Sequence, residues 1–286
     1  MDNPEISVLM TAYNREKYIG EAIESVLAST FQNWELIIVD DCSKDKTVEI
    51  AHSYAEKDER INVYINKQNL GDYPNRNKAA SYAKGRYLKY LDSDDVIYPH
   101  ALEIYSYYMN KFPKAALGLN WRFLQTEGKF PIFLQPEEAI KQHFQKGLFH
   151  NAPGSVIIRR DKFEEIGGFS GIRQIGDYEC WLKLASRFPV LKISFFPMWT
   201  RTHDEQELRV NSEYEKTIMK SITNLQFLES DNCIVNNKEK LKLISYNKKI
   251  IFKNAIKIVL KSFDIKGATY YLNKLKIRNE HSYFCS

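Results

Sequence analysis

The sequence has few of the residues from which disulfide frameworks, metal clips and membrane spans are built. Its 286 residues include only four cysteines, none in paired metal-ligand spacing, so we expect reduced thiols, as in the cytosol. The N-terminus has no basic segment followed by an apolar stretch, which predicts that there is no signal peptide. No apolar run is long enough to span a bilayer. These absences together predict a cytoplasmic protein.

Common phosphate-binding motifs are also missing. The chain has neither a P-loop nor a dinucleotide fingerprint. A nucleotidyltransferase usually carries a Gly-rich basic loop near its first strand, whereas residues 11–18 here read TAYNREKY. These classes of nucleotide-binding enzyme are therefore disfavoured.

The net charge of +5 is unevenly distributed along the chain. Residues 1–100 carry −5, residues 101–210 carry +3 and residues 211–286 carry +7. Nucleic-acid-binding proteins gather cations on the face that holds the ligand, but here the half that contains the polar motifs is negative. The distribution argues against nucleic acid as the main ligand.

Short apolar runs alternate with helical patterns in the first hundred residues. The candidate strands recur about every 25 to 29 residues, at 6–10, 34–40, 61–65 and 86–91. This alternation predicts an α/β fold with a mostly parallel sheet, built by right-handed crossovers and flanked by helices. Ligands bind beyond the carboxyl ends of such strands. The polar turns TAYN, DDCS and DSDD, which follow the first, second and fourth strands, are thus the first candidates for a site.

The rest of the chain is less regular. We expect a strand at 154–160, a helix at 177–188, a strand near 191–196, and helices from residue 211 onward. This pattern predicts one domain over residues 1–210 and a basic helical extension over residues 211–286.

Four lysines of the extension are spaced four residues apart, at Lys249, Lys253, Lys257 and Lys261. We expect them to form one cationic stripe beside an apolar surface. Such a stripe either attaches to a membrane surface or accompanies the packing of a terminal helix, and the sequence leaves both open.

Three acids, Asp92, Asp94 and Asp95, lie within four residues at the exit of the fourth strand. Carboxylates at such a place repel one another unless a cation lies among them. In extended backbone, residues i and i+2 project to the same side, so Asp92 and Asp94 can converge on one divalent cation, with Asp95 and a polyphosphate completing its shell. The alternative, a carboxylate that caps a helix beginning near Pro99, accounts for one acid and not for three. The sequence predicts a Mn²⁺ or Mg²⁺ site.

Two segments of the chain resemble the nucleotide-sugar domain of glycosyltransferase family 2, whose members are inverting enzymes with the Rossmann-like GT-A fold. These segments are residues 7–47 and NRNKAASYAKGRYLKYLDSDD (75–95). The resemblance covers about residues 5–205. It implies metal-dependent transfer, with inversion, from a nucleoside-diphosphate sugar to a saccharide or lipid-linked saccharide in bacterial surface polysaccharide synthesis. It also divides the domain into a nucleotide-sugar-binding half (1–100) and an acceptor and catalytic half (101–210).

The resemblance assigns nucleotide contacts to Thr11, Ala12, Tyr13, Asn14, Asp40, Asp41, Arg76, Asp92 and Ser93. A tyrosine ring offers a stacking face for the base. In the family, the carboxylate matched by Asp41 accepts the base N–H, which favours uracil, although thymine and guanine also present a donor. Arg76 suits phosphate through its planar fork of donors. The alternatives are a turn stabilised by Asp40 and Asp41 and a solvated arginine near a helix start.

The resemblance also implies a catalytic base and a metal-ligand set. In RQIGDYECWLKLA (173–185), Asp177 aligns with the acid that deprotonates the acceptor hydroxyl, and Gly176 stands where a glutamate is often found. Asp177 alternatively only caps a helix. His203 matches a histidine that some members use as a metal ligand or diphosphate contact, its alternative being a structural or surface role. The implied metal ligands are Asp94, Asp95 and His203.

One non-enzymatic interpretation also stays open. A chain with these motifs could bind a nucleotide sugar, or attach to a membrane through its basic tail, without transferring a sugar. The sequence alone does not distinguish either of these two possibilities from a catalytically active glycosyltransferase.

Overall fold

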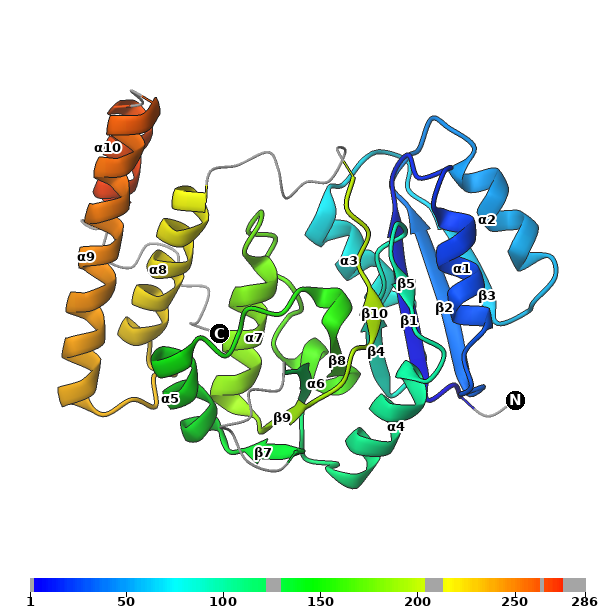
Figure 1. Cartoon of the computed structure of the whole chain (residues 1–286), viewed down its shortest axis with the longest axis horizontal. Helices are drawn as coiled ribbons and strands as arrows, with labels where there is room; N and C mark the ends of the chain where they lie inside the picture. Colours follow the sequence, from blue (N-terminus) through cyan, green and yellow to red (C-terminus); the bar gives the residue numbers. More distant parts are fainter. Residues whose placement is uncertain (1–2, 122–129, 204–212, 263–264, 275–286) are drawn as a thin grey trace.

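The computed structural model describes residues 3–121, 130–203, 213–262 and 265–274. An eight-stranded mixed sheet forms its centre, in the order β3-β2-β1-β4-β8-β6-β9-β7 (Figure 1). The strands are β1 Ile6–Ala12, β2 Trp34–Asp40, β3 Ile61–Ile65, β4 Tyr87–Tyr90, β6 Leu117–Asn120, β7 Ile132–Leu134, β8 Val156–Arg159 and β9 Val190–Ile193. Only β7 and β8 run antiparallel to their neighbours. The predicted α/β fold with a mostly parallel sheet is confirmed.

Strands β1 and β2 end level with each other at their carboxyl ends, whereas β4 already ends beside Leu9 of β1. Ala12 of β1 pairs with Asp40 of β2, and Leu9 of β1 pairs with Tyr90 of β4. Nearly every side chain of β1 and β2 is buried, as expected of parallel strands that helices cover on both faces. The turns that follow these strands therefore open at one edge of the sheet.

Helices cover the two faces of the sheet as separate layers. One layer contains α1 Ile19–Leu27, α2 Thr47–Ala55 and α4 Ala101–Lys111. The other contains α3 Asp72–Ser81, α5 Pro136–Lys146, α6 Arg160–Glu165 and α7 Gly176–Arg187, with a short 3-10 turn, η1, at Pro153–Ser155.

Helix α3 ends several residues before β4 begins. It begins at Asp72 and ends at Ser81. The backbone N–H groups of Lys84 and Gly85 instead donate to Oε1 of the buried Glu35, at 2.7 and 3.3 Å. A buried carboxylate of β2, two strands away from β4 in the sheet, thus binds the turn before β4.

The C-terminal extension is helical, as predicted. It consists of α8 Glu213–Glu229, α9 Asn237–Ser262 and α10 Ile265–Lys274, which lie at the end of the molecule opposite α1 and α2 (Figure 1). Helix α8 joins the main core through Phe227 and Leu228 and shares a small core with α9. The predicted boundary between residues 210 and 211 lies outside the described residues. No helix in the described ranges is long and apolar enough to cross a membrane.

The predicted cationic stripe on α9 is only partly present. Lys249 and Lys253 are exposed, whereas the Lys257 ammonium group lies 5.2 Å from the centre of the Tyr214 ring on α8. The side chain of Lys261 lies outside the described residues. Because an α-helix turns once every 3.6 residues, a spacing of four drifts around its surface, and the drift carries Lys257 toward α8.

Candidate active site

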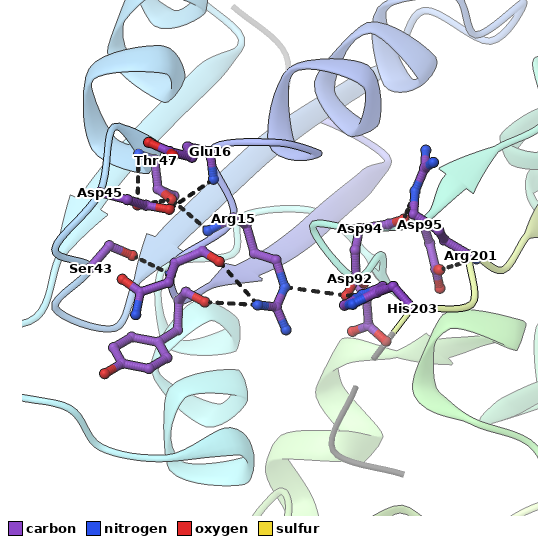
Figure 2. A network of polar contacts seen from close by, with 12 residues as sticks. Arg15, Glu16, Ser43, Asp45, Thr47, Asp92, Asp94, Asp95, Arg201 and His203 are labelled. Atoms are coloured by element: carbon purple, nitrogen blue, oxygen red, sulfur yellow. Dashed lines mark hydrogen bonds and ion pairs between the residues drawn. The ribbon is translucent and has the colours of Figure 1, made fainter. Parts of the chain in front are cut away.

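The loops after β1 and β2 are fastened to each other (Figure 2). Asn14 has a positive φ of 53°, its backbone N–H donates to Ser43 Oγ at 2.8 Å, and its Oδ1 accepts from Lys44 N–H at 2.8 Å. Thr11 is half-buried and Ala12 is buried, whereas Tyr13 is 45% exposed. The ring predicted to stack on the base is therefore free to do so.

The two acids of the DDCS turn have different surroundings. Both oxygens of Asp40 accept hydrogen bonds from Ser43, which is the turn geometry given above as the alternative. Asp41 Oδ1 accepts from Asn66 Nδ2 and Leu70 N–H, both at 2.8 Å, and Oδ2 accepts from Gly71 N–H at 2.9 Å. Asp41 thus holds the loop after β3 against the site. The nucleotide contacts of both acids remain predictions.

Arg76 lies on α3, where it is buried against Asp92 of the acidic turn after β4, and it is not a solvated residue. Its Nε donates to Asp72 at 2.6 Å and its Nη2 donates to Asp92 at 2.7 Å. Its Nη1 is buried and has no partner among the described residues. A buried donor without a partner is rare in folded proteins and indicates a place for a ligand acceptor.

A two-stranded ribbon brings distant residues to the acidic turn. Strand β5 (Val96–Ile97) pairs antiparallel with β10 (Met198–Trp199). The loop after β10 consequently lies beside residues 92–95, and Arg201 N–H donates to Asp95 Oδ1 at 3.0 Å. This pairing explains how His203 meets Asp94 across more than a hundred residues.

Asp94 is the centre of the polar cluster in Figure 2. Its Oδ2 lies 2.9 Å from Nε2 of His203 and 3.2 Å from Nε of Arg15. Two ligands of one octahedral cation, each about 2.0–2.1 Å from it at a right angle, are separated by about 2.9 Å. His203 Nδ1 is buried without a partner among the described residues. The same 2.9 Å is the length of a direct hydrogen bond, so a divalent cation held by Asp94 and His203 would replace the bond that joins them here.

The four residues of the DSDD turn alternate in exposure. The side chains of Asp92 and Asp94 are 34% and 12% exposed, whereas Ser93 and Asp95 are each only 3% exposed. Burial, reinforced by Asp92, raises the pKa of Asp95 to about 7, and burial lowers the pKa of Lys89 beneath the turn to about 7. Ser93 and Asp95 thus offer no exposed side chain to a ligand.

The predicted metal trio is not assembled as a site. Within the part of the chain that the structure describes, no three histidine, cysteine or acidic residues are grouped to hold a metal ion. Asp94 and His203 are together, but Asp95 is turned toward the backbone of Arg201. The physical reason is the β5–β10 ribbon. It brings the backbone N–H of Arg201, in the loop after β10, to the Asp95 carboxylate, which accepts its hydrogen bond.

Asp177 lies in the first turn of α7, which begins at Gly176. Its Oδ1 accepts from the Tyr73 hydroxyl at 3.2 Å and from Tyr178 N–H at 2.7 Å. Burial raises the pKa of Asp177. A Cβ atom at Gly176 would lie 2.8 Å from Cε2 of Tyr73, so the Tyr73 ring occupies the space of a side chain at that position. Glu179 is fully buried and pairs with Lys183 at 2.9 Å.

The residue after Asp177 ties α7 to the C-terminal helices. The Tyr178 hydroxyl lies 2.8 Å from His143 Nε2 and donates to Asn224 Oδ1 at 2.7 Å. Asn224 Nδ2 donates in turn to Asn247 Oδ1 at 3.2 Å. A chain of hydrogen bonds thus runs from α5 through α7 and α8 to α9.

The family model described as glycosyl transferase family 2 matches residues 7–167, which contain the three polar turns. The chain belongs to glycosyltransferase family 2. Members of this family are enzymes, and the match includes every predicted donor-side residue up to Asp95.

Two relatives show how far the family likeness extends. An uncharacterized glycosyltransferase of Methanocaldococcus jannaschii is 34% identical over 194 residues, which are 64% of this chain and 65% of that protein. TuaG of Bacillus subtilis, whose name assigns it to teichuronic acid biosynthesis, is 33% identical over 188 residues, 64% of this chain and 73% of that protein. The aligned part therefore covers less than two thirds of the first of these proteins.

Solved glycosyltransferases share the fold. TarS from S. aureus in complex with UDP-GlcNAc has a TM-score of 0.70 at 18% identity, over 95% of this chain and 79% of that chain. The mannosyltransferase PcManGT from Pyrobaculum calidifontis, in complex with GDP-Man and Mn²⁺, has a TM-score of 0.59 at 13% identity, over 99% and 78%. These likenesses establish the GT-A fold.

Two residues of this glycosyltransferase site were absent from the sequence prediction. Arg15 follows the TAYN turn, so its place after the first strand was a usable signal. Tyr73 lies in the first turn of α3, and its contact with Asp177 spans 104 residues. No local pattern announces such a contact.

Proposed function

We propose that the chain transfers a sugar from a nucleoside-diphosphate sugar, preferably a UDP-sugar, to a hydroxyl group of a saccharide or lipid-linked saccharide, with inversion at the anomeric carbon. The observation that supports this proposal is a hydrogen-bonded connection between the acidic turn, proposed to bind the donor, and Asp177, proposed to act on the acceptor. Arg15 and Arg76 flank the acidic turn, and the Tyr73 hydroxyl connects that side to Asp177.

The donor side offers a contact for each part of the nucleotide. The exposed Tyr13 ring can stack on the base. Asp41 Oδ2 accepts one hydrogen bond in the described structure, which leaves an acceptor position for a ring N–H. The unpartnered Nη1 of Arg76 suits a phosphate oxygen. The likeness to TarS, which was solved with UDP-GlcNAc, favours uridine.

Asp94 and His203 would hold Mn²⁺ or Mg²⁺. When bound, such an ion supplies positive charge that stabilises the departing diphosphate. The guanidinium group of Arg15, 3.2 Å from Asp94, is placed to contact the same phosphates. The likeness to PcManGT, solved with GDP-Man and Mn²⁺, supports this assignment.

Asp177 acts on the acceptor. Its carboxylate takes the proton of the acceptor hydroxyl while the hydroxyl oxygen forms a bond to the anomeric carbon. The bond from that carbon to the phosphate oxygen breaks, and its electron pair leaves with the nucleoside diphosphate. Burial raises the pKa of Asp177, which makes it a better proton acceptor near neutral pH. One displacement inverts the anomeric carbon.

Calorimetric titration of UDP, with and without Mn²⁺, tests the donor site. We expect metal-dependent binding in the wild type that Asp94→Ala removes and that Asp161→Ala, at an exposed acid on α6, retains. Binding of GDP or dTDP in place of UDP would change the base assignment only. If no nucleotide binds, the proposal is wrong and the interpretation as a membrane adaptor without transferase activity replaces it.

Hydrolysis of the UDP-sugar that binds, followed by transfer to saccharides, tests the reaction. Asp177→Asn is expected to bind donor but to lose transfer by at least about a hundredfold, as for a general base. The anomeric proton coupling in the product gives its configuration, and retention would contradict the single displacement. The name of TuaG supports surface polysaccharide synthesis as the process.

We further propose that α9 places the protein on an anionic lipid surface, where a lipid-linked acceptor would be found. Large apolar side chains are exposed along this helix, with Leu241 at 69%, Phe252 at 56% and Leu260 at 72%. Lys248 and Lys249 lie beside them and line a shared hollow with Leu241 and Phe252. An apolar helix surface flanked by lysines is typical of helices that lie in a bilayer interface.

The charge of α9 favours lipid over a second copy of this chain. The helix contains eight lysines and one glutamate, so two facing copies would bring like charges together. Anionic headgroups instead attract each lysine near the surface by about 1 kcal/mol.

Sedimentation with vesicles tests this contact. Binding to vesicles that contain phosphatidylglycerol is expected at low salt, reduced by Lys248→Glu with Lys249→Glu and unchanged by Lys57→Glu with Lys67→Glu, at exposed sites of the donor half. Equal binding to neutral phosphatidylcholine, or a dimer that Phe252→Ser dissolves, would contradict the proposal.

A further inference from the structure

Helix α8 places a lysine beside Tyr178, the residue that follows Asp177. The Lys220 ammonium nitrogen lies 3.3 Å from Nδ1 of His150 and 5.2 Å from the centre of the Tyr178 ring. Lys220 lies beyond the segment that the family model matches, which ends at residue 167. The C-terminal extension therefore contributes a cation to the acceptor side of the site.

No acid within the described structure pairs with this lysine. Its ammonium nitrogen forms no ion pair with a described acid, and its one polar contact among the described residues is the imidazole of His150. Burial lowers the pKa of both Lys220 and His150. A partly desolvated cation is costly unless an anion compensates it.

Asp177 provides that compensation only at longer range. The charge of Asp177 opposes the lowering of the Lys220 pKa by burial, and the charge of Lys220 opposes the raising of the Asp177 pKa by burial. The two charges thus stabilise each other, although no ion pair joins them among the described residues. His150 is exposed, so the space beside Lys220 is open to a ligand.

We propose that Lys220 and His150 form an anion subsite beside Asp177, and that the acceptor carries a phosphate or carboxylate close to the hydroxyl group that receives the sugar. The proposal rests on the proposed transferase function and adds the chemical class of its acceptor. An ammonium group binds phosphate and carboxylate through short, charge-assisted hydrogen bonds. Neutralising Lys220 in this way would leave Asp177 a stronger base.

Saturation-transfer NMR with three small probes tests the subsite. Glycerol, glycerate and glycerol 3-phosphate share a polyol and differ in charge. With the protein loaded with UDP and Mn²⁺, we expect at least one anion to bind about tenfold more tightly than glycerol, as a charged hydrogen bond predicts. The anion that binds better distinguishes phosphate from carboxylate acceptors, and either preference supports the subsite.

Variants assign the preference to Lys220. Lys220→Gln is expected to remove the tenfold preference, and Lys220→Arg to keep most of it. Lys141→Gln, at an exposed position of α5, is the matched control and should change nothing. Equal binding of all three probes, no binding of any, or a preference that survives in Lys220→Gln would overturn the proposal.

The subsite and the transferase function can fail separately. If UDP does not bind, the same titration with the nucleotide-free protein still shows whether Lys220 selects anions. If UDP binds with Mn²⁺ but the wild type does not prefer anions, the donor site stands and only the anionic acceptor is wrong.

Discussion

Replacing Tyr73 by phenylalanine removes one hydroxyl group from the contact between α3 and α7. That hydroxyl donates to Asp177 Oδ1 at 3.2 Å. Burial raises the pKa of Asp177, and this hydrogen bond opposes the rise because it favours the charged carboxylate. The ring stays in place, since a phenylalanine still fills the space against Gly176.

The expected effect is a shift of the acidic limb of kcat/KM toward higher pH. A hydrogen bond to a charged group contributes about 1.5–3 kcal/mol, and 1.36 kcal/mol corresponds to about one pKa unit. The pKa of Asp177 should therefore rise by about one to two units in Tyr73→Phe. Below the limb a larger fraction of Asp177 is protonated, so transfer slows by about ten- to a hundredfold, whereas the rate on the plateau changes little.

Transfer rates measured between about pH 5 and pH 9 give the position of the limb. Tyr82→Phe is the matched control, because its ring stacks on Tyr64 at 3.8 Å and lies at the other end of α3. Thermal melting shows whether either variant is misfolded. An acidic limb that stays where it is in Tyr73→Phe, in a protein that Asp177→Asn inactivates, would refute the role of this hydrogen bond.

Three other changes have defined outcomes. Gly85→Ala places a Cβ atom 2.6 Å from the backbone nitrogen of Ser7, so denaturant unfolding should show a loss of about 1–3 kcal/mol or more. His143 has its pKa lowered by burial from 6.5 to about 3; the folded state then binds fewer protons than the unfolded state between these values, and the free energy of unfolding falls as pH drops through this window, by up to about 1.4 kcal/mol per unit. His143→Gln should flatten that slope in urea titrations at pH 5 and 7, and an unchanged slope would contradict the cause. His203→Gln should weaken Mn²⁺-dependent UDP binding by at least about tenfold, and unaltered calorimetric affinity would exclude His203 from the site.

The sequence was sufficient for the architecture of the first half because local patterns determine it. Buried apolar runs at β1 and β2 and regular helical connectors specify a parallel sheet. The polar turns then fall at one edge, where Asp94 lies in the structure. The extended backbone expected at residues 92–95 is instead a turn, in which the Asp95 N–H donates to the Asp92 carbonyl at 3.0 Å, so the i and i+2 geometry of a strand does not apply there.

Contacts across the chain were beyond such reasoning. The β5–β10 ribbon has two residues in each strand, too few for a period to be recognised, yet it decides that His203 faces Asp94 and that Asp95 does not. The Tyr73–Asp177 contact likewise depends on the packing of α3 against α7. Motif spacing identified which residues carry the chemistry, but not which of them touch.

The C-terminal extension, expected as a separate unit, is joined by hydrogen bonds to the helix that carries the proposed base. Tyr178 follows the proposed base directly and is bonded to Asn224 of α8, which is bonded to Asn247 of α9. Lys220, one turn before Asn224 on α8, is the residue that approaches Asp177. Because hydrogen bonds between buried groups fix orientation as well as position, a shift of α9 on a membrane would be felt at α7. The same helices would thus select the acceptor and hold the base that acts on it.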